Sequence, residues 1–219
     1  MKRAVIFDLD GTLVDSEDFI VWSFVEAGRV VGVVVDGELV RSLLGRSLED
    51  VVEVVFRGVE RRVVEEVLTV RERFVRENWR RMVRVFPDVV PALRALASRG
   101  FLLAVASSSR VDRVVEFLEY FDLLRYFHVV AGVTPGIPGK PSPAVILRAL
   151  RSLGVQPGEA VYVGDREVDC LASRGASVDF VLVSRSGRSR LENCEPVIVV
   201  KSLLELPEAL SKLYIIGGK

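Results

Sequence analysis

The sequence contains few residues of the types that bind soft metals or form covalent cross-links: two cysteines, Cys170 and Cys194, and one histidine among 219 residues. The cysteines lack the clustering of a disulfide framework or a zinc site, and we expect Cys170 to be a packed helix residue in a reducing compartment. No apolar run approaches the roughly 18 residues that span a bilayer. The first apolar run ends at Asp8, too early for a signal peptide. These absences predict a cytoplasmic protein without membrane contact.

An excess of either charge sign is also missing, because 30 Lys and Arg residues balance 30 Asp and Glu residues. Nucleic-acid binding usually leaves a basic excess, so the balance argues against such a partner. Half of the residues are apolar, as in an ordinary globular protein. The length allows one domain or a domain with an insertion, in a monomer or a homodimer.

Apolar runs of strand length alternate with helical patterns from Pro87 onward. With a first strand that ends at Asp8, the expected strands cover 101–106, 127–133, 160–164, 178–183 and 197–200. Between and after them the pattern favours helices over 91–99, 109–120 and 142–154 and from 203 onward. This alternation predicts an α/β fold, a Rossmann-like doubly wound parallel sheet covered on both faces.

The segment 15–84 interrupts that pattern with helices only. Apolar residues recur there every three or four positions, for example at Val63, Val67 and Val70, and Ser47 begins a capping box. We interpret the valine-rich tract 30–35 as a turn region between helices. The sequence therefore predicts a core domain of residues 1–14 and 85–219 with an inserted helical cap domain of residues 15–84.

Polar motifs follow four of the predicted strands, and the carboxyl ends of parallel strands are where open α/β sheets bind ligands. Residues two apart on a strand point to the same side, so Asp8 and Asp10 can converge. The motifs are Asp8-Leu-Asp10-Gly11-Thr12, Ser107-Ser108-Ser109, Gly139-Lys140-Pro141-Ser142 and Gly164-Asp165 with Asp169. Carboxylates, hydroxyls and an ammonium together suit a hard cation and a phosphoryl group.

These motifs, in this order and with a helical insertion after the first, resemble the haloacid-dehalogenase superfamily. The resemblance is to its phosphoglycolate phosphatase and β-phosphoglucomutase branch, covers the whole length, and includes the segment 86–89, where the chain returns to the core. Two positions depart from the family pattern: Ala144 stands where an acidic residue is common, and Arg166 where a small one is common. Neither departure removes a catalytic group.

The resemblance implies a role for each motif. Asp8 would be the nucleophile, and Asp10 would protonate the leaving group and then activate water. Ser107, Ser108 and Lys140 would bind the phosphoryl group. Mg²⁺ would be the cofactor, held by Asp8, the backbone carbonyl of Asp10, Asp165 and Asp169. The implied activity is that of a phosphatase acting on a small phosphorylated metabolite.

Other activities of the superfamily fit less well. Dehalogenases lack an acid where Asp10 stands, and phosphonatases need a cap lysine, which the segment 15–84 does not contain. Thr12 and a histidine-free cap favour a phosphatase over a β-phosphoglucomutase-like phosphoryl transferase, which stays open. A binding protein that kept the fold without catalysis is the third alternative, but it would not need the acid Asp10.

Substrate choice is expected to come from the cap. The segment 40–47 resembles the specificity loop of the family, a glycine turn at Gly45 that faces the active site. Arg41 or Arg46 would then bind a carboxylate or second phosphate of the substrate. Phosphoglycolate and sugar phosphates are the expected substrates, with phosphoglycolate as the first hypothesis.

Overall fold

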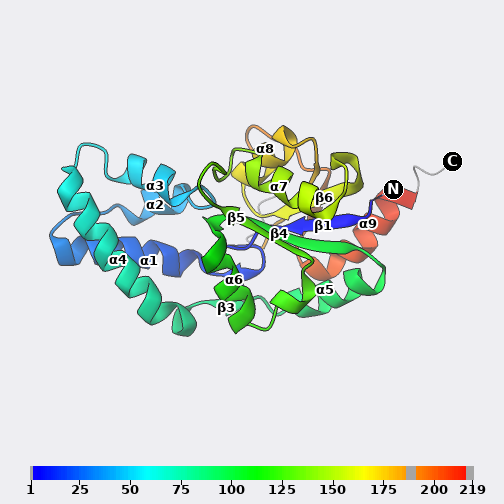
Figure 1. Ribbon diagram of the computed structural model, residues 1–219, viewed down its shortest axis with the longest axis horizontal. Helices are drawn as coiled ribbons and strands as arrows, with labels where there is room; N and C mark the ends of the chain where they lie inside the picture. Colours follow the sequence, from blue (N-terminus) through cyan, green and yellow to red (C-terminus); the bar gives the residue numbers. More distant parts are fainter. Residues whose placement is uncertain (1, 186–190, 216–219) are drawn as a thin grey trace.

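A parallel sheet lies between two layers of helices in the computed structural model, which describes residues 2–185 and 191–215 (Figure 1). The strand order is β5-β4-β1-β6-β7-β8, and each neighbouring pair is parallel. The strands are β1 (Ala4–Phe7), β4 (Leu102–Arg110), β5 (Val129–Val133), β6 (Ala160–Gly164), β7 (Asp179–Val183) and β8 (Ile198–Val200). The predicted α/β fold is confirmed, with β1 in the middle of the sheet.

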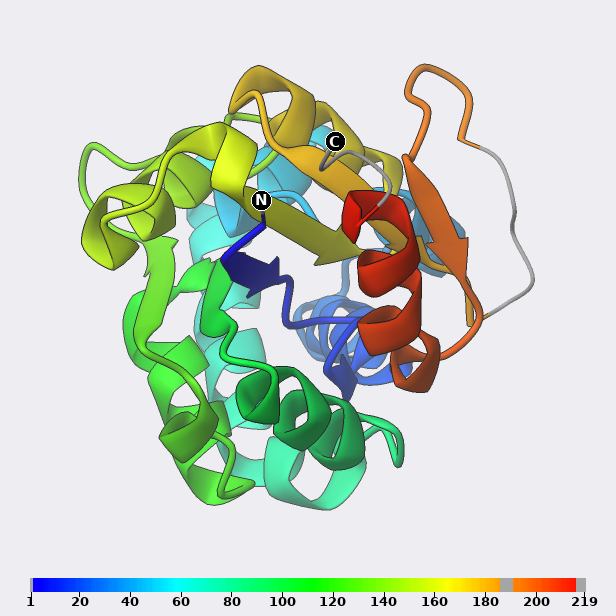
Figure 2. The same ribbon diagram turned by 90° about the vertical axis from the view of Figure 1, so that its right-hand side faces the viewer.

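Both faces of the sheet are covered because alternate residues of each strand point to opposite sides. On β1, Val5 and Phe7 belong to the apolar core under one helical layer, and Ala4 and Ile6 to the core under the other. The first layer holds α5 (Val89–Ser98), α6 (Val111–Tyr120) and α9 (Leu206–Ile215), and the second α7 (Ala144–Leu153) and α8 (Glu167–Gly175) (Figure 2). The connections contain the short 3₁₀ helices η1 (Leu124–Tyr126), η2 (Pro157–Glu159) and η3 (Leu203–Glu205).

Four helices between β1 and α5 form a separate group at one end of the sheet, which we call the cap (Figure 1). They are α1 (Glu17–Val31), α2 (Gly37–Ser42), α3 (Leu48–Val55) and α4 (Arg61–Met82). The cap has its own apolar core, which includes Phe24, Val40 and Val67. Its two connections to the sheet lie side by side, because β2 (Val14–Asp15) pairs antiparallel with β3 (Arg84–Val85). In the described ranges, no helix combines the length and apolar character needed to cross a membrane.

Cys170 is a packed helix residue as expected, but the expectation that the cysteines form no disulfide is wrong, because Cys170 and Cys194 are bonded to each other. Cys170 is buried on α8, one residue after Asp169, and Cys194 lies between β7 and β8. Beside the disulfide, the backbone and side-chain nitrogens of Asn193 donate to Glu167 Oε1 at 2.6 and 2.8 Å. The chain runs through β7 between the two cysteines, so their proximity depends on the fold and not on spacing. The bond fastens the β7–β8 connection to α8.

Candidate active site

Asp8 follows the central strand β1 directly, and its backbone N–H donates to the carbonyl of Val163 at 2.8 Å. Lys140 reaches it from the loop before α7: the ammonium Nζ lies 2.6 Å from Asp8 Oδ1 and 2.5 Å from Asp169 Oδ1. Lys140 and Asp169 are fully buried, and Asp8 nearly so. Three of the four motifs therefore meet in one buried chain of carboxylate, ammonium and carboxylate.

Burial and the neighbouring charges shift the pKa values of Asp8 and Lys140. Burial raises the pKa of Asp8 to about 7, with further contributions from Asp169 and Asp10 and against the attraction of Lys140. Burial alone would lower the pKa of Lys140, but the carboxylates of Asp169 and Asp8 outweigh it and raise that pKa well above its ordinary value. Lys140 therefore stays cationic, whereas Asp8 exchanges its proton near neutral pH.

The carboxylates of Asp8, Asp165 and Asp169 can each place one oxygen within 4.8 Å of the others. Burial, followed by the charges of Asp169 and Asp8, raises the pKa of Asp165 well above its ordinary value. Gly11 makes room for this cluster: its φ is +78°, and a Cβ there would lie 2.5 Å from Asp165 Oδ2. Oxygen donors of this kind match a hard divalent cation such as Mg²⁺.

Asp10 lies apart from this cluster and has different partners. The hydroxyls of Ser16 and Ser109 donate to its two carboxylate oxygens at 2.5 and 3.2 Å. Burial raises the pKa of Asp10 above its usual range, although both hydroxyls and Lys140 lower it in part. A carboxyl group with a raised pKa can donate a proton at higher pH than an exposed one.

The serines near the carboxyl end of β4 differ in whether their hydroxyl protons are free to bind a ligand. Ser107 Oγ accepts from the backbone N–H of Ser109 at 3.0 Å, and no described residue accepts its hydroxyl proton. Ser108 Oγ donates to the carbonyl of Gly45 at 2.7 Å and accepts from the backbone N–H of Lys140 at 2.9 Å. Ser107 is therefore available as a donor to a phosphoryl oxygen, whereas the Ser108 proton already joins the core to the cap.

A cavity of about 170 Å³ separates the cap from the core at this point. The core contributes Asp8, Asp10, Ser107, Ser108, Ser109 and Lys140, and the cap contributes Phe24, Leu44, Gly45, Arg46 and Arg71 among others. Gly45 has a φ of +89°, and a Cβ there would lie 2.7 Å from Val168 Cγ2. Gly45 thus allows the cap loop to approach α8, and Arg46 is exposed at the cavity.

Arg41 does not line this cavity. Its Nη2 lies 2.7 Å from Asp18 Oδ1, and its carbonyl accepts a hydrogen bond from Arg166. It borders a second hollow of about 690 Å³ that also includes Asp165. Arg166 pairs with Glu17 of the cap and lies 3.6 Å from Asp165 Oδ2. Arg166, which stands where the family commonly has a small residue, therefore connects the cap to the carboxylate cluster.

Three residues of the site have no signal in the sequence that distinguishes them. Ser16 binds Asp10 from the start of the cap, and the Tyr162 hydroxyl donates to Ala106 O at 2.7 Å while its ring lies 5.8 Å from Lys140 Nζ. Arg71 is one arginine among several on the amphipathic helix α4, and only packing shows that it faces the cavity.

The profile of the family described as haloacid dehalogenase-like hydrolase matches residues 5–183. A phosphoglycolate phosphatase of Aquifex aeolicus (strain VF5) is 30% identical over 82% of this chain and 84% of that protein. The pyrophosphatase PpaX of Bacillus mycoides (strain KBAB4) is 28% identical over 96% of this chain and 98% of that protein.

Solved structures share the fold. The crystal structure of CbbY from Rhodobacter sphaeroides, in complex with phosphate, matches with a TM-score of 0.80 and 24% identity, covering 94% of this chain and 96% of that one. A hydrolase from Pseudomonas syringae matches with a TM-score of 0.83 and 23% identity, covering 97% and 99%. At these identities the likeness shows the architecture only.

Proposed function

The chain belongs to the haloacid dehalogenase-like hydrolases, and from this premise we propose that it is a Mg²⁺-dependent phosphatase of small phosphomonoesters that forms an aspartyl-phosphate on Asp8. The observation that carries the proposal is the difference between two carboxyl groups at one cavity. Asp8 contacts the ammonium of Lys140, whereas Asp10 receives hydrogen bonds from two hydroxyls outside the carboxylate cluster. A nucleophile and a proton donor need these different surroundings.

The first half-reaction is a transfer of the phosphoryl group to the enzyme. A carboxylate oxygen of Asp8 bonds to phosphorus while the ester P–O bond breaks. Asp10 gives its proton to the departing alcohol oxygen. Ser107 donates to a phosphoryl oxygen, and Lys140 offsets the repulsion between the anionic nucleophile and the anionic substrate.

The second half-reaction returns the enzyme to its starting state. Asp10, now a carboxylate, accepts a proton from a water molecule whose oxygen attacks phosphorus. The P–O bond to Asp8 breaks, inorganic phosphate leaves, and Asp10 is protonated again. One alcohol and one phosphate result from one ester and one water.

The carboxylates of Asp8, Asp165 and Asp169 fit the metal that the family uses. Their oxygens are hard donors, and three neighbouring acids, two buried and one half-buried, need a compensating charge beyond that of Lys140. When bound there, Mg²⁺ would supply positive charge next to the phosphoryl group and would favour the ionised form of the carboxylates.

A small anionic metabolite is the substrate that the cavity favours. The cavity lies between cap and core, and a volume of about 170 Å³ has no room for a protein or a polynucleotide. The relatives named phosphoglycolate phosphatase and pyrophosphatase place phosphoglycolate and pyrophosphate among the first compounds to test, with sugar phosphates next. No nucleic acid or membrane partner is part of the proposal.

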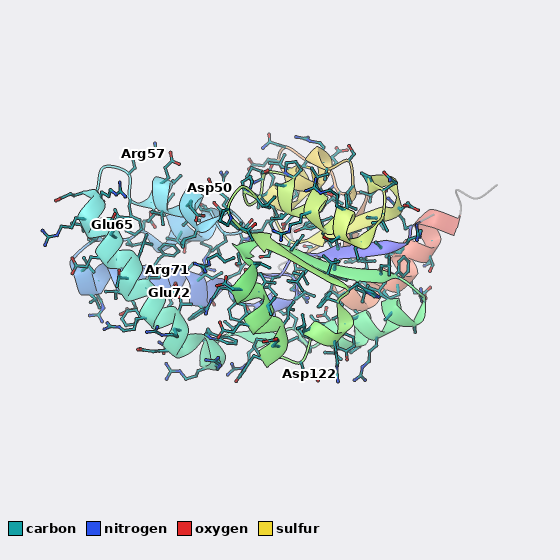
Figure 3. All side chains as sticks on the ribbon, viewed as in Figure 1. Asp50, Arg57, Glu65, Arg71, Glu72 and Asp122 are labelled. Carbon is teal, nitrogen blue, oxygen red and sulfur yellow. A yellow bond between two sulfur atoms is a disulfide. The ribbon has the colours of Figure 1, made fainter. Side chains whose placement is uncertain are left out.

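Hydrolysis of p-nitrophenyl phosphate with and without Mg²⁺ tests the proposal, with Asp8→Asn as the decisive variant. We expect the wild type to release nitrophenol and inorganic phosphate, and Asp8→Asn to lose essentially all turnover because an amide does not attack phosphorus. Asp122→Asn is the matched control, since Asp122 is exposed between α6 and η1 (Figure 3). Asparagine also tolerates its φ of 55°.

Two outcomes would overturn the proposal. Turnover in Asp8→Asn equal to that of the control would remove Asp8 as the nucleophile. A wild type that retains the phosphoryl group and passes it to a sugar phosphate, without release of inorganic phosphate, would be a β-phosphoglucomutase-like transferase.

A further inference from the structure

Arg71 is a half-buried arginine whose guanidinium has no carboxylate partner among the described residues. It projects from the cap helix α4 at the side that faces the core (Figure 3), and it lines the same cavity as Asp8 and Lys140. Its guanidinium stacks 4.1 Å from the ring centroid of Phe24. Across the described parts of the chain, its one side-chain hydrogen bond runs from Nε to Ser23 Oγ at 3.1 Å.

The guanidinium of Arg71 is held in position by Ser23 and Phe24, whereas its two terminal nitrogens make no hydrogen bond to a described residue. Ser23 is fully buried and its own hydroxyl donates to the carbonyl of Ile20, which holds the acceptor in place. The guanidinium carbon of Arg71 lies over the ring of Phe24. Neither terminal nitrogen of Arg71 is bonded to a described residue, and neither is sealed from solvent. A guanidinium in this state offers two N–H groups side by side, the geometry that binds a carboxylate or a phosphate.

A second arginine lines the same cavity from the core. Arg113, on the core helix α6, also lines it and donates from Nη1 to Glu116 Oε2 at 2.7 Å. Its Nη2 is buried and has no partner among the described residues. A buried donor without a partner costs free energy, so an anion that accepts a hydrogen bond from this nitrogen would be stabilised.

The electrostatics agree with this geometry. Burial, together with the positive charge of Arg113, lowers the pKa of Arg71 to about 10, although the carboxylates of Glu72 and Asp10 oppose this shift in part. Glu72 and Glu49 also border the cavity, but both are exposed and neither is bonded to Arg71. Two neighbouring cations without a shared anion form a site where a bound anion relieves their repulsion.

We propose that Arg71 and Arg113 together bind a second anionic group of the substrate, a carboxylate or a further phosphoryl group, while its reacting phosphoryl group lies at Asp8. The inference rests on the proposed phosphatase function, because it assigns the remote end of the same substrate. Since Arg71 belongs to the cap and Arg113 to the core, such an anion bridges the two and holds the cap against the sheet. The sequence suggested this role for Arg41 or Arg46, of which only Arg46 lines the cavity.

The test compares substrates with and without a second anionic group in the variant Arg71→Met. For phosphoglycolate or pyrophosphate we expect kcat/KM to fall about 10- to 100-fold, mainly through KM, because a charge-assisted bond is lost. For p-nitrophenyl phosphate, which has no second anion, the change should stay within about 3-fold. Arg71→Lys should recover part of the loss. The two anionic substrates separate a carboxylate subsite from a phosphoryl subsite.

The matched control is Arg57→Met, because Arg57 is an exposed cap arginine outside the cavity (Figure 3). Equal losses on p-nitrophenyl phosphate and on the anionic substrates, or no loss on any, would overturn the subsite. Calorimetric binding of phosphoglycolate and pyrophosphate to the Asp8→Asn protein, with and without Arg71→Met, gives a readout that needs no turnover. A wild type that hydrolyses none of these compounds, together with binding that still depends on Arg71, would refute the proposed function and keep the anion site.

Discussion

Lys140 Nζ lies 2.6 Å from Asp8 Oδ1, although the two residues are 132 positions apart in the chain and both are buried. The contact forms because β1 and the loop before α7 end at the same edge of the sheet. Lys140 is shared with Asp169, so one ammonium neutralises part of a cluster of carboxylates. The positive charge of Lys140 therefore reduces the electrostatic repulsion between the carboxylates and an anionic substrate at Asp8.

Replacing Lys140 by methionine should lower kcat on p-nitrophenyl phosphate by about 10²–10³-fold, because a positive charge preorganised at the phosphoryl group is lost. The change also leaves the buried Asp8 and Asp169 without their shared cation, so urea unfolding should show reduced stability. Lys201→Met, at an exposed lysine, is the control. A Lys140→Met protein with more than about a tenth of the wild-type kcat would contradict this role.

The replacement Asp10→Asn should depend on the leaving group. An alkyl phosphate needs a proton on its departing oxygen, whereas nitrophenolate leaves without one. We expect kcat/KM to fall far more for phosphoglycolate than for p-nitrophenyl phosphate, measured with the same protein preparation. Equal losses on both would mean that Asp10 serves in dephosphorylation or in the geometry of the site instead of as the acid.

Mg²⁺ should stabilise the folded protein through the carboxylates of Asp8, Asp165 and Asp169. A ligand at about 100 times its dissociation constant adds about 2.7 kcal/mol, which for a chain of this size raises Tm by about 5–10 °C. Asp165→Asn should remove most of that shift, and EDTA should remove it from the wild type. A wild-type Tm that does not respond to Mg²⁺ would count against the metal site.

The sequence was sufficient for the sheet and for the residues around Asp8, because both follow from local rules. Apolar runs mark buried strands, and carboxylates directly after strands must gather at one edge when the strands are parallel. The distinction between Arg41 and Arg71 does not follow from such rules. Both are helical arginines, and which of them pairs with Asp18 and which faces the cavity depends on how the cap helices pack.

The disulfide shows the same limit. The spacing of Cys170 and Cys194 gives no reason to pair them. They come together only because the connection after β7, which contains Cys194, lies next to α8, which contains Cys170. Ser16 is a similar case: its hydroxyl reaches Asp10 only because the chain turns at Gly11, where a positive φ brings the cap's first residues back to the strand end. Neither contact can be inferred from residue spacing alone, because each depends on the path of the folded backbone.

Breaking the disulfide with Cys194→Ser or with a reductant should destabilise the protein by about 3 kcal/mol, since the bond closes a loop in the unfolded chain. The two cysteines are 24 positions apart. Thermal unfolding with and without dithiothreitol measures the effect. The reductant should leave the Tm of Cys194→Ser unchanged, and an equal shift in that variant would mean that the reductant acts elsewhere.

Asp88 should make stability depend on pH. Burial would raise the pKa of Asp88, but hydrogen bonds from Arg185, Ser202 and the backbone N–H of Leu203 outweigh it and hold that pKa below its usual range. Arg185 Nη1 and Ser202 Oγ donate to Asp88 Oδ2 at 3.0 and 2.8 Å. The contact joins the start of α5 to the β7 and β8 ends of the sheet.

Because the folded-state pKa of Asp88 is lower than its unfolded value of about 3.9, the carboxylate contributes stability that is fully present above that value and is lost as the pH falls through the folded-state pKa. Asp88→Asn should therefore cost about 2 kcal/mol at pH 7 and progressively less as the pH falls below about 4. Urea unfolding of both proteins across this range measures the difference.

Asp112→Asn is the control. Asp112 also has a pKa lowered by an arginine, but it is exposed, so solvent screens its ion pair. A gap between wild type and Asp88→Asn that widens towards low pH would show that the carboxylate is not the stabilising form.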